Sequence, residues 1–188
     1  MGEIKKDYRC LVVKNFLHID ICRIFSNYAI MRHRVNKDNR IDTVTNNIHT
    51  SHYGDKFSES ILLYCKDKME KLTNKKLFPT YSYWRMYTYG SYLKEHKDRN
   101  ACEISATIHV DGDKDDWPII VGEKEYFTKP GDAVIYLGIE DSHSRKKFEG
   151  DFQTQIFLHY VDQEGPFKDQ KYDKRIDVGV SGEDYGGL

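Results

Sequence analysis

The sequence lacks three features that would point to a membrane, a nucleic acid or a disulfide-linked fold. It contains no run of roughly 18 apolar residues, so we expect no transmembrane helix. The 29 Lys and Arg residues nearly balance the 30 Asp and Glu residues, which argues against a nucleic acid or an anionic membrane as partner. The four cysteines are widely separated and include no C-x-x-C pair, which argues against a zinc ribbon and predicts reduced thiols.

The size and composition predict one compact domain in a reducing compartment. Residues 1–6 carry neither an apolar stretch of signal-peptide length nor an acylation motif, so we expect a soluble, cytoplasmic protein. With 188 residues, 39% of them hydrophobic, the chain suits a single domain with its own core. We expect residues 1–162 to form this domain and the polar residues 163–188 to form a C-terminal tail. No feature indicates an oligomeric state.

The hydrophobic periodicity predicts two helices followed by short strands. Apolar residues at helical spacing predict helices at 19–32 and 57–73. The polar, aperiodic stretch 33–55 between them is expected to be a long loop. Strands are predicted at 8–16, 80–89, 102–110, 117–121, 125–129, 132–138 and 153–161. Helices followed by antiparallel strands predict an α+β fold, and the even strand spacing favours a sandwich or jelly roll.

Two of the predicted strands alternate strictly between two kinds of side chain. In 80–89, one face carries Tyr81, Tyr83, Arg85, Tyr87 and Tyr89. In 102–110, one face is apolar, and the other carries Glu103, Ser105, Thr107 and His109. A strand of this kind packs on a core with one face and borders a wet cavity with the other.

His-x-Asp pairs are the candidate metal ligands. On a strand, such a pair presents both side chains on one face, and a distant second histidine completes the ligand set of non-haem Fe(II) oxygenases. The spacing alone is not specific, because the chain contains three such pairs: His18/Asp20, His96/Asp98 and His109/Asp111. The first lies at the start of a predicted helix and the third enters an acidic turn. The middle pair opens a strand region at the mouth of the predicted cavity, so we favour it.

The stretch around the middle pair resembles a known family. Residues 85–98, Arg-x-Tyr-x-Tyr-Gly-Ser-Tyr-Leu-x-x-His-x-Asp, resemble the prolyl 4-hydroxylase-like branch of Fe(II)/2-oxoglutarate dioxygenases. Further along the chain, Lys-Pro-Gly-Asp-Ala-Val-Ile-Tyr at 129–136 resembles the penultimate-strand signature of that branch, and 157–162 resembles its closing strand. His143 follows the signature at the distance of the distal metal ligand. The resemblance covers about residues 80–162.

The resemblance implies a double-stranded β-helix (jelly roll) with the N-terminal helices packed on the major sheet. It implies that His96, Asp98 and His143 bind Fe(II), with no catalytic side chain beyond these ligands. The enzyme would use 2-oxoglutarate and O2 to hydroxylate a C–H bond of a protein or peptide, prolyl residues included, or of a small molecule, and would release succinate and CO2. His159 is a rival for the distal ligand, but its mid-strand position suits a hydrogen-bonded core histidine better.

The sequence departs from the family pattern at the cation that holds the distal carboxylate of 2-oxoglutarate. Relatives place Lys or Arg early in the last strand, whereas residues 152–155 are Phe-Gln-Thr-Gln. Arg145 is the first substitute, because on a strand it would share a face with His143; Arg85 and Arg99 are the second and third. Tyr87 and Thr107 are expected to add hydroxyl groups to the binding of 2-oxoglutarate.

Two other functions stay open. Residues 117–121 replace a Gly-Gly-x-Thr stretch of many prolyl hydroxylases, so the substrate cannot be taken from that group. A cupin-like metal enzyme would keep the metal ligands and not respond to 2-oxoglutarate. A non-catalytic jelly-roll binding module would not bind iron. The near-neutral charge argues against a nucleic-acid substrate for any of them.

Overall fold

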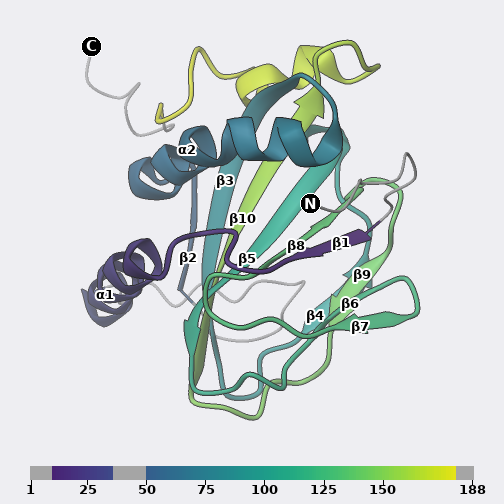
Figure 1. Ribbon diagram of the computed structural model, residues 1–188. Coiled ribbons are helices and arrows are strands. Elements are labelled where there is room, and N and C mark those ends of the chain that lie inside the picture. Colours follow the sequence, from purple (N-terminus) through teal and green to yellow (C-terminus); the bar gives the residue numbers. More distant parts are fainter. Residues whose placement is uncertain (1–9, 36–49, 181–188) are drawn as a thin grey trace.

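The computed structural model describes residues 10–35 and 50–180, which form two antiparallel sheets and two α-helices (Figure 1). The larger sheet has six strands in the order β1-β8-β5-β10-β3-β2, and the smaller has four in the order β4-β9-β6-β7. The elements are β1 (Cys10–Val13), α1 (Ile19–Val35), β2 (Thr50–Tyr53), α2 (Lys56–Thr73), β3 (Leu77–Thr88), β4 (Leu93–His96), η1 (Asn100–Cys102), β5 (Ile104–Gly112), β6 (Ile119–Val121), β7 (Lys124–Tyr126), β8 (Ala133–Tyr136), β9 (His143–Arg145), β10 (Phe152–Asp162) and η2 (Lys168–Lys174).

The two helices lie close to where their periodicity predicts them. The carboxylate of Asp55 caps α2 by accepting from the backbone N–H groups of Phe57 and Ser58. The helix ends at Asn74, which adopts the left-handed conformation (φ 52°) that asparagine tolerates. α1 continues three residues beyond the predicted end at residue 32.

The predicted loop 33–55 is wrong at both ends. Its first residues complete α1, and Thr50–Tyr53 form β2, an edge strand that pairs with β3. The sequence of β2, Thr-Ser-His-Tyr, shows no apolar alternation, so its strand character comes from pairing rather than from local pattern. Residues 36–49 lie outside the described residues.

One face of the six-stranded sheet forms the main core together with the helices (Figure 1). A single hydrophobic cluster contains buried residues of α1, α2 and strands β3, β5, β8 and β10. Phe25 of α1 meets Trp84 of β3 edge to face, with ring centroids 5.8 Å apart. Ile61, Cys65 and Met69 of α2, predicted to share one helix face, are all buried in this cluster.

The opposite face of the same sheet is polar and aromatic, and it faces the site. The register pairs Tyr81, Tyr83, Arg85 and Tyr87 of β3 with His159, Phe157, Gln155 and Gln153 of β10. On its other edge, β10 pairs His159, Phe157 and Gln155 with Ser105, Thr107 and His109 of β5. The strict alternation of these strands therefore separates an apolar core from a polar wall, as the sequence predicts.

The remaining strands agree with prediction in place but not always in length. β5 begins at Ile104, so Cys102 is not on the apolar face of a strand; it lies in the single 3-10 turn η1. β4 and β9 are four and three residues long, too short for a periodic signal in the sequence.

The segment after β10 contacts the domain as far as it is described. Arg175 forms an ion pair with the buried Glu59 of α2 at 2.5 Å. Asp173 accepts hydrogen bonds from Arg99 and Tyr53. The domain boundary at residue 162 remains a prediction, and residues 181–188 lie outside the described part.

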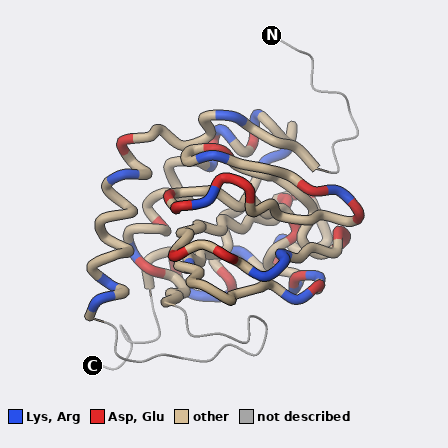
Figure 2. The backbone as a smooth tube through the Cα atoms, turned by 90° about the horizontal axis from the view of Figure 1, so that it is seen from below, with Lys and Arg blue, Asp and Glu red and all other residues tan. Residues whose placement is uncertain are grey.

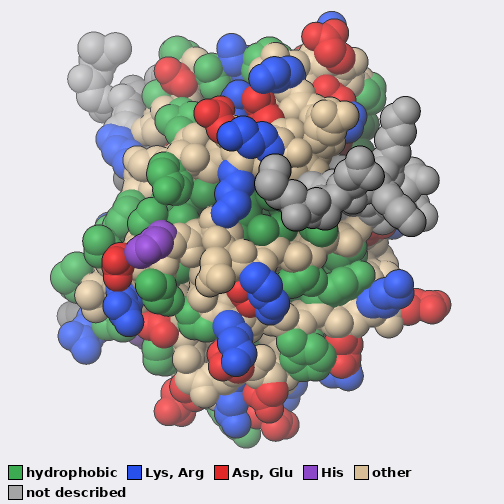
Figure 3. Space-filling model, viewed as in Figure 1, with side chains coloured by type: hydrophobic (Ala, Val, Ile, Leu, Met, Phe, Trp, Pro, Cys, Tyr) green, Lys and Arg blue, Asp and Glu red, His purple; other side chains and the backbone are tan. Residues whose placement is uncertain are grey.

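Acidic and basic residues alternate along the described chain (Figure 2). On the face seen in Figure 3, Lys and Arg side chains lie among Asp and Glu side chains, in keeping with the net charge of -1. In the described ranges, no helix combines the length and the apolar character needed to cross a membrane.

Candidate metal centre

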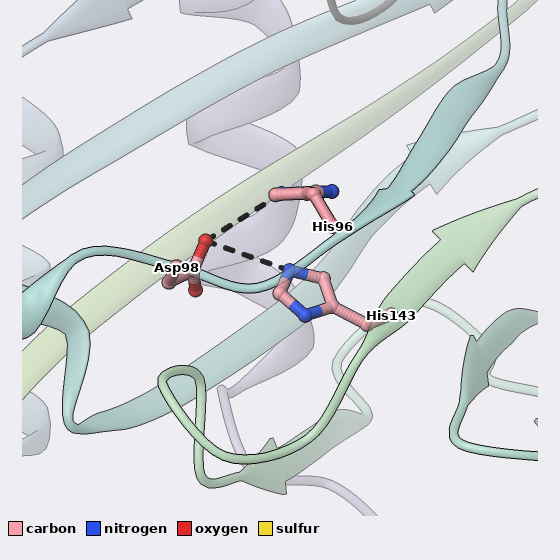
Figure 4. A group of neighbouring side chains, drawn as sticks. All are labelled: His96, Asp98 and His143. Atoms are coloured by element: carbon pink, nitrogen blue, oxygen red, sulfur yellow. Dashed lines mark ion pairs between the residues drawn. The ribbon is translucent and has the colours of Figure 1, made fainter.

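His96, Asp98 and His143 converge from two neighbouring strands of the smaller sheet (Figure 4). His96 is the last residue of β4 and His143 the first of β9, and the two are paired across the antiparallel ladder. Asp98 follows two residues after His96, and its backbone N–H donates to the carbonyl of Gly138 at 2.8 Å. A short strand pair and one backbone hydrogen bond thus place three side chains from distant parts of the sequence at one point.

The distances between the donor atoms suit a single cation. Oδ1 of Asp98 lies 3.5 Å from Nε2 of His96 and 3.6 Å from Nε2 of His143. Ligands of one metal ion with bonds of about 2.0–2.2 Å lie at about this separation from one another. Two imidazole nitrogens and one carboxylate oxygen form the donor set of non-haem Fe(II) sites with open positions.

Backbone carbonyls orient both rings so that Nε2 carries the lone pair. Nδ1 of His96 lies 2.8 Å from the carbonyl oxygen of Lys94, and Nδ1 of His143 lies 3.1 Å from that of Asp141. A carbonyl oxygen only accepts, so each Nδ1 must donate its proton. In the neutral rings, the Nε2 atoms that face Asp98 are therefore free to bind a cation.

The electrostatics of the three residues oppose one another. The hydrogen bond to Asp98 raises the pKa of His96, whereas burial lowers the pKa of His143. Burial alone would raise the pKa of Asp98, but the hydrogen bond from His96 and the nearby histidines outweigh it and hold that pKa below its usual value. Asp98 is thus an anion at neutral pH, and its Oδ2 is buried without a hydrogen-bond partner.

The three residues open onto a cavity of about 250 Å³ between the two sheets. Its wall includes the polar face of β3 and the ligand cluster, and its size is at the lower end for small-molecule sites. The lining residues are Tyr81, Tyr83, Arg85, Tyr87, Leu93, His96, Asp98, Ile119, Tyr136, His143, Phe157 and His159. A larger hollow of about 410 Å³ lies beside Trp117 and contains none of the candidate ligands.

Arg145 is the most deeply buried of the three candidate cations. It is 2% exposed, and burial lowers its pKa, which the nearby phenols of Tyr87 and Tyr136 counter. One guanidinium nitrogen donates to the carbonyl of Trp117 at 3.1 Å, while Nε and the other terminal nitrogen have no partner. Among the described residues, no carboxylate forms an ion pair with it. A buried guanidinium with free donors and no counter-ion suits an anionic ligand.

The other two arginines have partners of their own. Arg99 is half-exposed, pairs with Asp173 at 2.7 Å and lies over the ring of Tyr81. Arg85 lines the cavity and donates to the hydroxyl of Tyr83 at 3.1 Å. The structure therefore keeps Arg145 first and makes Arg85 its main rival.

The two predicted hydroxyl donors are in different situations. Tyr87 lines the cavity, and its hydroxyl is buried without a partner. Thr107 is buried, does not line the cavity and donates to Oε1 of Gln155 at 3.2 Å. Thr107 is thus at one remove from the cavity, behind Gln155.

The other histidines of the motif search do not join the cluster. His18 and Asp20 are about two-thirds exposed at the start of α1. Asp111 accepts from Ser26 of α1 and from Gly112, so the third pair also points away from the site. His159, the rival distal ligand, lies on the far side of Asp98, and burial lowers its pKa to about 4.

Two residues that the sequence reasoning passed over help to build the site. A Cβ at Gly138 would lie 2.6 Å from Oδ2 of Asp98 and 2.5 Å from the carbonyl of Cys102, so only glycine permits this approach. Trp117 packs against Tyr87 and under Arg145, with its ring 4.7 Å from that guanidinium. Neither role has a local signal, because both depend on contacts between distant segments.

Comparisons with known proteins give matches only at the level of structure. Neither the models of known protein families nor the curated protein sequences match the chain. A Pseudomonas putida prolyl-4-hydroxylase superposes with a TM-score of 0.65 at 15% identity, covering 82% of this chain and 93% of that one. The non-heme alpha-ketoglutarate-dependent epimerase SnoN from nogalamycin biosynthesis gives 0.69 at 11% identity, covering 94% and 92%. HygX from Streptomyces hygroscopicus, solved with nickel and 2-oxoglutarate, gives 0.61 at 11%, covering 83% and 84%.

The chain therefore has the fold of the 2-oxoglutarate-dependent oxygenases. The resemblance to the prolyl 4-hydroxylase-like branch, which the sequence carries between about residues 80 and 162, is confirmed at the level of fold. At these identities the likeness defines the architecture, and function has to be argued from the site itself.

Proposed function

We propose that this chain is an Fe(II)- and 2-oxoglutarate-dependent dioxygenase that hydroxylates a C–H bond of a protein, peptide or small-molecule substrate. The observation that carries the proposal is the convergence of His96, Asp98 and His143 at a cavity, with an unpaired buried guanidinium nearby. The scaffold would be a double-stranded β-helix backed by the two N-terminal helices.

The residues fit the cofactors this activity needs. His96 and His143 would bind Fe(II) through Nε2, and Asp98 through its carboxylate. Arg145 would hold the distal carboxylate of 2-oxoglutarate, with Tyr87 donating its hydroxyl and Gln155, positioned by Thr107, close to the same wall. When bound, iron, 2-oxoglutarate and O2 supply the oxidising chemistry, in which 2-oxoglutarate becomes succinate and CO2.

The chain itself contributes orientation and exclusion of water. The carbonyls of Lys94 and Asp141 fix the ligand rings, and the aromatic wall limits access of water to the cavity. The cavity wall combines tyrosines with Arg85, so a substrate with aromatic-compatible and polar parts suits it. Prolyl peptides are one candidate, since prolyl hydroxylases share the fold.

The test is the visible spectrum of anaerobic apo protein after addition of Fe(II) and 2-oxoglutarate. We expect a charge-transfer band that needs both additions and is lost in His143→Ala. The matched control is His18→Ala, which removes an exposed histidine from the same His-x-Asp pattern and should keep the band.

Two other results would redirect the assignment. Iron binding without the band would favour a cupin-like metal enzyme that does not use 2-oxoglutarate. No iron binding would leave a jelly-roll binding module. If the band forms, product analysis on candidate substrates must separate hydroxylation from epimerisation, the activity named for SnoN.

A further inference from the structure

A second group of possible metal ligands lies on the other side of Asp98. Cys102, His159 and Asp98 each offer one ligand atom, and these atoms all lie within 4.8 Å of one another. Cys102 is 1% exposed and His159 is 5% exposed, so both are buried beside the cavity rather than on the surface. This group contains a sulfur ligand, which His96 and His143 do not provide.

The hydrogen bonds around His159 leave its Nε2 free. The hydroxyl of Ser105 donates its single proton to the carbonyl of Cys102 at 3.2 Å. The same oxygen lies 2.9 Å from Nδ1 of His159, so it accepts the Nδ1 proton. The lone pair of the neutral ring is then on Nε2, as a metal ligand requires.

The other two ligands are also prepared. Oδ1 of Asp98 faces His96 and His143, while its Oδ2 is buried without a partner. The Sγ of Cys102 lies 3.1 Å from the hydroxyl of Tyr81, which can donate to a thiolate. Gly138 admits this crowding, because a Cβ there would overlap both Oδ2 of Asp98 and the backbone of Cys102.

We propose that Cys102, His159 and Asp98 form a second site, one that binds a thiophilic divalent cation of the Zn²⁺ class. Thiolate, imidazole and carboxylate are all zinc ligands, and thiolate selects soft cations over hard ones. A thiolate, a carboxylate and a neutral ring exactly balance two positive charges, which favours the site in a buried position. Binding releases the thiol proton to solvent.

The shared carboxylate makes the two sites compete. With a cation at each, four positive charges would face only Asp98 and one thiolate in a buried region, so simultaneous occupancy is unfavourable. A thiophilic cation at the second site therefore withdraws Asp98 from the first and acts as an inhibitor of iron binding.

Anaerobic titration of the apo protein with Co²⁺ alone tests the site. Thiolate bound to Co²⁺ gives a near-ultraviolet charge-transfer band, and the first site contains no sulfur that could produce it. We expect the band in wild type and its loss in Cys102→Ser. The matched control Cys10→Ser, which removes a half-buried thiol elsewhere, should keep it.

Two further variants guard against a Cys102→Ser protein that fails to fold. His159→Gln should weaken Co²⁺ binding, measured by the band, by at least about tenfold, since even loss of an outer-shell partner costs that much. His143→Ala should keep the band, because this residue belongs only to the first site. Absence of the band in wild type, its loss in Cys10→Ser, or its loss in His143→Ala would each overturn the proposal. None of these readouts depends on whether the first site binds iron.

Discussion

Replacing Arg145 by Met separates the role of this residue in binding from its role in stability. The side chain is buried with no carboxylate partner among the described residues, so it is poorly placed to stabilise the free protein. We expect Arg145→Met to fold with stability close to that of wild type and to lose most of its affinity for 2-oxoglutarate.

The expected stability change is a small difference of opposing terms. The substitution leaves the carbonyl of Trp117 without its 3.1 Å donor, which costs about 1–3 kcal/mol. It also removes the contact of the guanidinium with the Trp117 ring, worth up to about 2 kcal/mol. Against these, replacing buried ionic groups by apolar side chains of similar volume often stabilises by about 1–4 kcal/mol. The net change should lie within about 2 kcal/mol of zero.

The expected binding change is much larger. Removing one member of a buried, hydrogen-bonded charge pair costs about 2–5 kcal/mol, which is a loss of roughly 30- to 3000-fold in affinity. The assay is an anaerobic titration with 2-oxoglutarate in excess Fe(II), followed at the charge-transfer band, with urea unfolding of the free protein alongside. Arg99→Met is the control, because that guanidinium is already paired with Asp173.

An affinity for 2-oxoglutarate within about threefold of wild type in Arg145→Met would refute the assignment of this residue. The same titration of Arg85→Met would then identify the cation, because Arg85 is the other arginine on the cavity wall.

Three predictions concern stability. Glu70→Gln should lower the free energy of unfolding at pH 7 by about 1–3 kcal/mol, because the backbone N–H of Leu77 and two lysines hold the pKa of Glu70 at about 2. Since that pKa is lowered from 4.5, the difference from wild type should be full above pH 4.5 and vanish as the pH falls through 2 in urea titrations. Trp84→Ala should cost about 3–5 kcal/mol in urea unfolding. Arg175→Met should cost about 3–5 kcal/mol, since it strands the buried carboxylate of Glu59, and adding Glu59→Gln should restore most of the loss.

Each stability prediction has an outcome that contradicts it. Tyr64→Ala on the exposed side of α2 is the control for Trp84→Ala and should change stability by less than about 0.5 kcal/mol. Equal effects of the two would mean that the helix–sheet core does not carry the fold. A Glu70→Gln difference that persists at pH 2 would show that its cause is not the carboxylate charge.

The sequence predicts the large strands and their two faces because the signal for a face is local. In β3, alternate positions send Trp84 and Met86 into the core with the helices, and Tyr83 and Tyr87 to the cavity. That pattern is fixed by the period of two residues and by the contrast between apolar and polar side chains. The same reasoning places the polar residues of β5 on the inner side.

The short elements escape prediction because pairing rather than periodicity forms them. β2 is a polar edge strand, and β4 and β9 together have too few residues to show a period, although they carry His96 and His143. Cys102 alternates correctly with the residues of β5, yet the chain turns before Ile104 and places its thiol beside Asp98. The lack of a partner for Arg145 is likewise a property of the tertiary structure.

The distribution of buried polar atoms argues that the inner face of the larger sheet is built for ligands. Tyr87, Asp98, His109, Arg145 and Gln155 each have a buried side-chain atom with no hydrogen-bond partner within the described protein. Each such atom costs about 1–3 kcal/mol when it stays unpaired, so the helix-covered core must offset this cost. A ligand that pairs these atoms recovers the loss on binding. The free protein should therefore gain stability with added ligand by more than its apolar contacts alone would supply.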